Sequence, residues 1–243
     1  MCTVTFVPAG GRLFITHNRD ERSLRSRAIA PGEYRVGRHT LLFPRDTQAG
    51  GTWIAVNANG AAAVLLNGAF AKHSSQPPYR KSRGLVLLDI IASGDAVDSW
   101  QCIDLRGIEP FTVLLWSNGR LYEGRWDGER KDSRLPDATR AHSWSSVTLY
   151  DEAVRARREQ WFARWRQQYP QPLQEDIWQY HLQGGEGDAH NDLCMDRGNG
   201  MLTVSVTSLE LLPDHCRMKY LDLQNNTTHS QQLLFTQCPI LNP

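Results

Sequence analysis

Cys2 directly follows the initiator methionine, and a cysteine is small enough for aminopeptidases to remove that methionine. Removal of Met1 would leave a thiol and a free α-amine on one residue. The thiol titrates at about pH 8.5 and the α-amine at roughly pH 7.7–8.0, so the amine can take the thiol proton close to neutral pH. Cys2 is therefore a candidate nucleophile for an amide carbonyl, with its own amine as base and then acid. Met-Cys starts also arise by chance, so this signal needs support elsewhere in the chain.

A polar run at 17–21 (His-Asn-Arg-Asp-Glu) directly follows a short apolar segment at 13–16. A Gly-Gly pair at 10–11 predicts a hairpin turn that returns this segment beside Cys2. Side chains at the end of a strand project into the space above a sheet, so the run is a candidate part of the same site. The alternative is a charged loop in which Asp20 caps the next element.

A third candidate is Asn67, at the end of a segment that reads as a hairpin turning at Asn59-Gly60. A carboxamide at the end of a buried strand can donate a hydrogen bond to a developing oxyanion without adding a charge. One such donor typically contributes about 3 kcal/mol of transition-state stabilisation. The alternative is a turn asparagine that precedes Gly68.

The composition is that of a soluble globular protein, with 40% hydrophobic and 22% charged residues. A formal net charge of +1 gives no field that favours nucleic acid or a membrane surface. No apolar run approaches the roughly 18 residues of a membrane span, and the first apolar stretch, 4–7, is too short for a secretory signal. We therefore expect a single cytoplasmic domain over 1–243 that neither spans a membrane nor binds nucleic acid.

The cysteines are odd in number, scattered, and include no CxxC pair, so they predict neither a disulfide framework nor a zinc site. The acidic, histidine and cysteine residues between 188 and 196 fit no common metal spacing and are interpreted as a polar loop. We expect no metal and no cofactor. The five cysteines are Cys2, Cys102, Cys194, Cys216 and Cys238.

Short apolar segments separated by Gly-Gly, Asn-Gly and Asn-Asn pairs predict a mainly antiparallel sheet, because these pairs tolerate positive φ in hairpin turns. The expected strands are 3–7, 13–16, 53–56, 61–66, 112–116, 121–126, 202–207 and 220–223. Helices are expected over 85–93, over a short segment from Asp95, over 150–169 and over 173–182. On the third helix, the aromatic stripe is expected to face the core and the arginines, including Arg155, Arg157 and Arg158, to face solvent.

These features occur together in an order that resembles the NRDE family, which includes the eukaryotic transport-and-Golgi-organisation protein two. The matching parts are the Met-Cys start, Asn18-Arg19-Asp20-Glu21, Gly50-Gly51-Thr52-Trp53 and the segment 62–67. Segments 83–86, 142–146 and 203–207 match less specifically, and the resemblance covers nearly the whole chain. More remotely, the layout is similar to the choloylglycine hydrolase and penicillin V acylase group of N-terminal-nucleophile (Ntn) enzymes.

The resemblance implies an α+β fold, a four-layer αββα sandwich of mainly antiparallel sheets, and hydrolysis of a carbon–nitrogen amide bond. Residue by residue, it implies that Cys2 is the nucleophile, that Asp20 holds its amine and thiol, and that Asn67 is the oxyanion donor. The catalytic candidates are therefore Cys2, Asp20 and Asn67.

The sequence departs from the remote group in two places. That group's arginine falls at His17, and the available arginine, Arg19, directly precedes Asp20. Neighbouring residues of a strand point to opposite faces, so Arg19 is expected to face away from Cys2 if Asp20 faces it. A second asparagine of the group falls at Ser146. We take His17, Asn18, Arg19 and Ser146 as supporting or substrate-binding candidates.

The resulting hypothesis is a cysteine Ntn-type hydrolase of a small non-peptide amide. The alternative is a non-enzymatic carrier or chaperone for haem, an acylated lipid or acyl-CoA, which would use the same pocket. A basic run after the NRDE segment, from Arg22 to Arg38, is interpreted as a solvated face that could hold an anionic substrate group beside Cys2.

Overall fold

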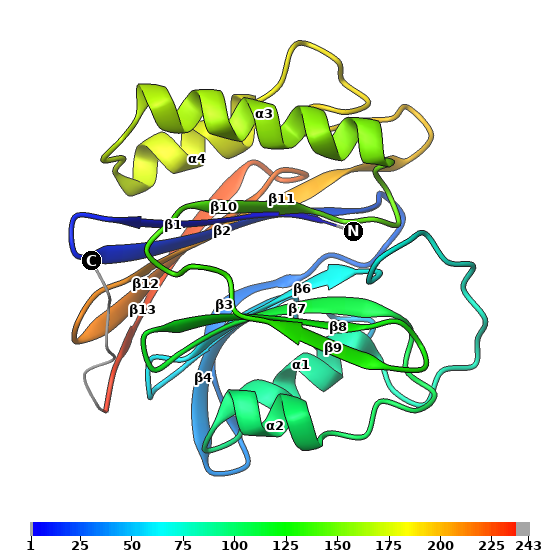
Figure 1. Cartoon of the computed structure of the whole chain (residues 1–243), viewed down its shortest axis with the longest axis vertical. Helices are drawn as coiled ribbons and strands as arrows, with labels where there is room; N and C mark the ends of the chain where they lie inside the picture. The colour runs from blue at the N-terminus through cyan, green and yellow to red at the C-terminus, as the bar shows by residue number, and fades with distance from the viewer. Residues whose placement is uncertain (1, 237–243) are drawn as a thin grey trace.

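The computed structural model describes residues 2–236, which form two antiparallel sheets between two layers of helices (Figure 1). In the first sheet the strand order is β10 (His142–Ser145), β1 (Cys2–Ala9), β2 (Arg12–Arg22), β11 (Met201–Leu211), β12 (His215–Asp222) and β13 (Thr227–Leu234). In the second sheet the order is β3 (Ile29–Val36), β4 (His39–Arg45), β5 (Ile54–Asn57), β6 (Ala62–Asn67), β7 (Phe111–Ser117), β8 (Arg120–Trp126) and β9 (Lys131–Arg134).

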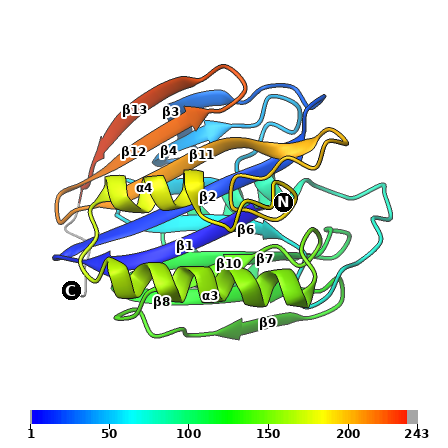
Figure 2. The same ribbon diagram turned by 90° about the horizontal axis from the view of Figure 1, so that it is seen from above.

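The helices cover the outer faces of the two sheets (Figures 1 and 2). Over the first sheet lie α3 (Glu152–Gln168) and α4 (Gln174–Gln183), and against the second lie α1 (Arg83–Ile91) and α2 (Ala96–Cys102). The predicted four-layer αββα sandwich is therefore confirmed. None of the helices in the described part of the chain is long and apolar enough to cross a bilayer.

The main core lies between the two sheets and includes alternate residues of β1, such as Val4 and Phe6, packed against residues such as Leu42 and Val64 of the second sheet. Alternation along each strand produces this arrangement because successive side chains point to opposite faces. A second cluster fills the space between the second sheet and the α1–α2 pair. Cys2 is 4% exposed and lies at the margin of the inter-sheet core.

Tight turns set the register of the hairpins that carry the candidate residues. Gly10 and Gly11 have φ of 59° and 72°, which L side chains rarely adopt. They join β1 to β2 so that Cys2 pairs with Arg19 and Thr5 with Thr16. The predicted hairpin that returns the NRDE segment beside Cys2 is therefore present.

The sequence-based expectation placed the NRDE segment directly after a strand, and this is wrong. Residues 18–21 lie inside β2, which runs from Arg12 to Arg22 and is hydrogen-bonded on both sides, to β1 and to β11. Polar side chains are tolerated in this central strand because partners on both faces satisfy them, and no local pattern in the sequence reveals those partners.

The expected helices are present, with ends that differ by a few residues, but the expected solvated arginine face is wrong in one place. Arg158 is 1% exposed and is one of the largest fully buried side chains of residues 2–236. Conversely, Tyr169, expected on the core stripe, is 42% exposed at the end of α3. The strands that were not anticipated are β3, β4, β9, β10 and β13.

Candidate functional site

A cavity of about 140 Å³ opens at the Cys2 end of β1, and we call it the Cys2 cavity. It lies between the first strands of one sheet and the loops of the other. Its lining includes Cys2, Arg19, Asp46, Asn67 and Arg83. The thiol, an arginine of the NRDE segment and the predicted oxyanion asparagine therefore share one space, although they are up to 65 residues apart in sequence.

Arg19 and Asp20 lie on opposite faces of β2. Arg19 is paired directly with Cys2 across the β1–β2 ladder, so the two side chains share the inter-sheet face. Asp20 is fully buried on the helix-covered face and does not line the Cys2 cavity. The expected alternation is therefore present. It places the side chain of Arg19, and not that of Asp20, beside the thiol.

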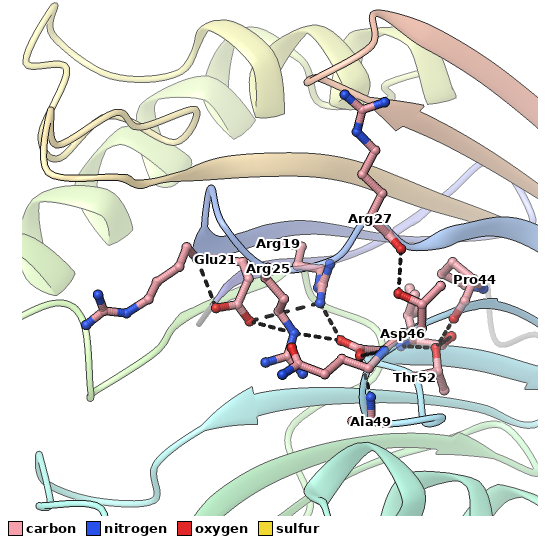
Figure 3. A network of polar contacts seen from close by, with 12 residues as sticks. Arg19, Glu21, Arg25, Arg27, Pro44, Asp46, Ala49 and Thr52 are labelled. Carbon is pink, nitrogen blue, oxygen red and sulfur yellow. Dashed lines mark hydrogen bonds and ion pairs between the residues drawn. The ribbon is translucent and has the colours of Figure 1, made fainter.

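Arg19 is held in place by an acidic partner and an aromatic ring. Its Nη2 donates to Asp46 Oδ2 at 2.6 Å, and its guanidinium lies 4.3 Å from the centroid of the Trp53 ring. Arg25 also contacts Asp46, with Nε at 3.0 Å from the same oxygen, and lies 3.5 Å from Glu21. Figure 3 shows the two arginines converging on Asp46.

The charges of this network favour the ionised carboxylate of Asp46. Burial alone would raise the pKa of Asp46, but a hydrogen bond from Arg25, one from the Ala49 backbone N–H and the charge of Arg19 together hold that pKa below its ordinary value. The Asp46 side chain is 9% exposed and that of Arg19 is 8% exposed, so this is a buried ion pair. Its geometry fixes the arginine beside the thiol.

One wall of the Cys2 cavity is formed where the backbones of Gly51 and Gly84 pack closely against each other. A Cβ on Gly51 would lie 2.3 Å from the backbone carbon of Gly84, and a Cβ on Gly84 would lie 2.8 Å from the carbonyl oxygen of Thr52. This approach places the start of α1, with Arg83, against the Gly-Gly-Thr-Trp segment. Arg83 is in turn paired with Glu109 at 3.0 Å.

Asn67 ends β6, and its side chain has no hydrogen-bond partner among residues 2–236. The following Gly68 has φ of 81°, and a Cβ there would lie 2.6 Å from the side chain of Val147. Ser146 lies beside both candidate residues: its N–H donates to the Cys2 carbonyl at 2.9 Å, and its hydroxyl donates to the Asn67 carbonyl at 2.8 Å. Because the single hydroxyl proton is engaged, Ser146 fixes the backbone at Asn67.

Asp20 occupies a polar network under α3. Its Oδ2 accepts from the Tyr150 hydroxyl at 2.7 Å, and its Oδ1 accepts from Thr203 Oγ1 at 2.7 Å. Arg158 stacks 3.6 Å from the centroid of the Tyr150 ring. Burial raises the pKa of Asp20, and it does so against the charge of Arg158 and the hydrogen bonds from Tyr150 and Thr203.

Asn18 and His17 lie on opposite faces of β2 and have different surroundings. The Asn18 amide donates to the carbonyls of His181 and Leu193 at 2.9 and 2.7 Å, so Asn18 joins the sheet to α4 and the following loop. His17 is buried between the sheets, with Nε2 3.4 Å from the Leu65 carbonyl and Nδ1 without a partner in the described chain. Burial lowers the pKa of His17 well below its ordinary value.

The Cys2 thiol is neutral at rest near pH 7. Burial raises the pKa of the thiol, and the nearby charge of Asp20 acts in the same direction, while Arg19 lowers it. Burial wins, so the sulfur requires a base to become nucleophilic.

Several residues of the site had no sequence signal of their own. Asp46 and Trp53 contact Arg19, and Arg25 contacts the same Asp46 carboxylate. Tyr150 donates to Asp20, and the charge of Arg158 acts on that carboxylate from α3. Trp53 was noted only within the Gly-Gly-Thr-Trp resemblance, Arg25 only within the basic run from Arg22 to Arg38, and Arg158 only as part of an arginine face expected to be solvated. Within residues 2–236, no group of three or more His, Cys, Asp or Glu side chains could hold a metal ion. The expectation about Met1 lies outside the described residues.

Solved structures with the same arrangement of sheets and helices define the class of fold. A mutant of the conjugated bile acid hydrolase of Clostridium perfringens has a TM-score of 0.61 at 12% identity, covering 100% of this chain and 99% of that one. Another variant of that enzyme has a TM-score of 0.60 at 13% identity, with the same coverage. A Caenorhabditis elegans orthologue of N-acylethanolamine-hydrolyzing acid amidase has a TM-score of 0.58 at 11% identity, covering 86% and 92%. This chain therefore has the Ntn-hydrolase fold.

The family resemblance noted from the motifs is confirmed over the first part of the chain. Residues 1–118 match the family described as Transport and Golgi organisation 2. That segment contains Cys2, the NRDE segment and Asn67. No curated protein sequence is similar enough to match.

Proposed function

We propose that this protein hydrolyses the carbon–nitrogen bond of a small non-peptide amide, with Cys2 as the nucleophile. Cys2 Sγ attacks the carbonyl carbon, a carbon–sulfur bond forms, and the carbonyl electron pair moves to oxygen. Collapse of this tetrahedral intermediate breaks the carbon–nitrogen bond, and the leaving nitrogen takes a proton. Water then attacks the thioester and releases the acid and the free thiol. The observation that carries the proposal is the shared cavity of Cys2, Arg19 and Asn67.

The thiol needs a base because burial keeps it protonated. In our proposal that base is the α-amine of Cys2 itself, freed by removal of Met1, and the same amine later protonates the leaving nitrogen. Asp20 is the proposed partner of this amine. In support, Asp20 lies on the adjacent strand, and the hydrogen bonds it accepts from the Tyr150 and Thr203 hydroxyls oppose the rise in its pKa that burial causes.

Asn67 is the proposed oxyanion donor. Its carboxamide is unpartnered within residues 2–236 and lines the cavity, so its N–H groups are available to a substrate oxygen. Arg19 adds a fixed positive charge beside the sulfur, which favours the thiolate as it forms. Arg19 is itself fixed by Asp46 and by Trp53, and this preorganisation limits the reorganisation needed during the reaction.

The size of the cavity supports a small substrate group. At about 140 Å³ it is well below the roughly 300 Å³ at which ligand clefts for drug-sized molecules begin. A short acyl group fits this space better than a haem. The four cysteines of the described chain are all free, which is in keeping with the proposed cytoplasmic setting.

The decisive experiment is to trap the acyl-enzyme. Purified protein would be incubated with a panel of short-chain acyl amides and thioesters, quenched in acid and analysed by intact-mass and peptide mass spectrometry. We expect removal of Met1 and one acyl adduct on Cys2, both unchanged in Cys102→Ser, which alters an exposed cysteine. Cys2→Ala should form no adduct.

Two outcomes would overturn the proposal. Retention of Met1 in the active protein would exclude the α-amine as base. If no substrate acylates Cys2 while haemin gives a Soret band that is lost in Cys2→Ala, the same cavity would instead serve a haem carrier.

A further inference from the structure

A second cavity lies on the other side of Asn67 and is rich in arginine. It also measures about 140 Å³ and lies where β10, at the edge of the first sheet, faces β8 and β9 of the second, near the start of α3 (Figure 1). We call it the arginine cavity, because Arg125, Arg134 and Arg155 line it. Asn67 lines this cavity as well as the Cys2 cavity.

Two of the arginines are fixed by one buried carboxylate. Glu123 has a fully buried side chain and accepts from Arg125 Nε at 2.6 Å, from Arg134 Nη2 at 2.6 Å and from the Trp144 indole at 2.8 Å. Burial opposes ionisation, but these partners hold the pKa of Glu123 below its ordinary value. Arg125 Nη2 and Arg134 Nη1 still have no partner within residues 2–236.

Arg155 reaches the same cavity from α3 and is unpaired. Its guanidinium has no hydrogen bond or ion pair with any described residue, and its Nε is buried. Glu159, one turn further along α3, lines the cavity but does not form an ion pair with Arg155. Leaving a buried guanidinium N–H without an acceptor is unfavourable, which makes the position a site that an anion would stabilise.

The charge balance of the cavity is positive. Arg125, Arg134 and Arg155 line it with three positive charges and Glu159 with one negative charge; counting also Glu123, which pairs with two of the arginines but does not line the cavity, the net charge is +1. Glu123 already accepts from two arginines and an indole, so it has little capacity to neutralise Arg155 as well. The free donors therefore suit an oxyanion, such as a carboxylate or a phosphate.

We propose that the arginine cavity binds an anionic group, a carboxylate or a phosphate, on the amine portion of the substrate. The acyl portion would lie in the Cys2 cavity, and the scissile carbonyl would lie at Asn67, which lines both cavities. The binding of an anion needs only the arginine cavity, whereas its assignment to the leaving amine rests on the proposed function. The substrate class is then an N-acyl derivative of a small acidic amine.

The first test measures anion binding without catalysis. In the Cys2→Ala background, acetate and inorganic phosphate would be titrated at constant ionic strength and followed by fluorescence, because Trp144 lines the cavity. We expect saturable binding of at least one anion, weakened about tenfold or more in Arg155→Gln and less in Arg155→Lys. Arg157→Gln is the matched control, because it removes an exposed arginine of the same helix, and it should leave the affinity unchanged.

The two anions separate the possible sources: preference for acetate indicates a carboxylate substrate, and preference for phosphate a phosphorylated one. Equal affinity in the Arg155→Gln and parent proteins, with both folded by circular dichroism, would exclude the arginine cavity as the binding site. An equal loss of anion affinity in the Arg157→Gln control would also exclude it, because the loss would then reflect the charge of the whole surface and not this cavity.

The second test compares two substrates that differ only in charge, such as a short-chain N-acylglycine and its glycinamide counterpart. If phosphate is the preferred anion, the pair becomes an N-acyl phosphoethanolamine and its ethanolamine counterpart. The wild-type protein should favour the anionic member by about tenfold in kcat/KM, and Arg155→Gln should lose the preference while still turning over the neutral one. Turnover without a preference would overturn the substrate assignment but leave the proposed function intact. Anion binding without any acylation of Cys2 would overturn the proposed function but leave the anion site intact.

Discussion

Arg19 and Asp20 are neighbours in the chain, yet their side chains belong to different networks on the two faces of β2. Arg19 joins Asp46 and Trp53 beside the thiol, while Asp20 joins Tyr150 and Thr203 beneath the helices. The NRDE segment therefore supplies both faces of the central strand. A substitution at each position should have a distinct effect, because each side chain has its own partners.

The buried pair of Arg19 and Asp46 should be sensitive to removal of the acid. Asp46→Asn leaves two arginines without their carboxylate, and breaking such a buried pair typically costs about 3–5 kcal/mol. We expect a loss of that order in the free energy of unfolding, measured by urea denaturation at pH 7. Asp104→Asn, which removes the exposed partner of Arg106, should cause no comparable loss. Similar stabilities for the two variants would contradict this interpretation.

Tyr150 should tune the ionisation of Asp20. Tyr150→Phe removes a 2.7 Å hydrogen bond to the carboxylate, and a hydrogen bond to a charged group contributes about 1.5–3 kcal/mol. Because that bond favours the ionised form, its loss should raise the pKa of Asp20 further. If Asp20 supports the nucleophile, the acidic limb of the kcat/KM profile should move to higher pH. A lower stability with an unchanged profile would limit Tyr150 to a structural role.

Two buried histidines should make stability depend on pH. Burial lowers the pKa of His181 to about 3 and that of His17 well below its ordinary value, so both rings stay neutral in the folded protein. The unfolded chain binds these protons as the pH falls below about 6.5. Stability is therefore fully present above about pH 6.5 and decreases on acidification, by about 1.4 kcal/mol per pH unit for each ring.

Urea denaturation at several values between about pH 6.5 and pH 5 tests this linkage. His181→Gln should reduce the slope of stability against pH by about half, even though it also weakens the contacts with Asn18 and Thr5. A wild-type stability that is flat across this pH range would show that the rings are not buried neutral.

At the scale of elements, the geometry of the Cys2 cavity depends on how closely α1 can approach the segment before β5. Gly51 and Gly84 meet without room for a Cβ on either residue. A glycine in the sequence signals conformational freedom, but here the requirement is for space. The contact could not be predicted locally, because the two residues are 33 positions apart.

Gly84→Ala should disturb this wall. The added Cβ would lie 2.8 Å from the Thr52 carbonyl oxygen, so the backbones must separate, and overpacking of this kind typically costs about 1–3 kcal/mol. We expect a lower thermal midpoint together with weaker substrate binding, seen as a raised KM. Gly94→Ala is the matched control, because a Cβ there meets nothing within 4 Å. If both variants have the thermal midpoint and KM of the wild type, the close packing at Gly84 does not position the wall of the Cys2 cavity.

Most of the strands that the sequence failed to predict are edge strands. β9, β10, β3 and β13 are the outer strands of the two sheets, and β13 is exposed over most of its length. An edge strand with polar residues on both faces has no apolar alternation to reveal it. The central strands β1, β6 and β7 were predicted because burial imposes an apolar pattern on them.

At the scale of the whole molecule, the two sheets should differ in local stability between centre and edge. β2 is hydrogen-bonded on both sides and covered by α4, whereas β13 pairs with β12 alone among the strands of residues 2–236. Hydrogen–deuterium exchange should therefore show early exchange in β13 and β9 and late exchange in β2 and β11. Equal protection of β13 and β2 would indicate that the edge is covered in solution, for example by another chain.

The sequence by itself determined the fold class and the residues that could carry chemistry. Turn residues and buried alternation predicted a mainly antiparallel α+β domain, and the family resemblance implied the αββα sandwich; Cys2, the NRDE segment and Asn67 were identified by type and spacing. Only the tertiary structure decided which of these residues meet. Strand register placed Arg19 with Cys2 and Asp20 with Tyr150, and packing between the sheets brought Asp46 and Trp53 to the guanidinium. The reason is physical: composition and periodicity depend on neighbours along the chain, whereas a site is formed by side chains that approach one another across it.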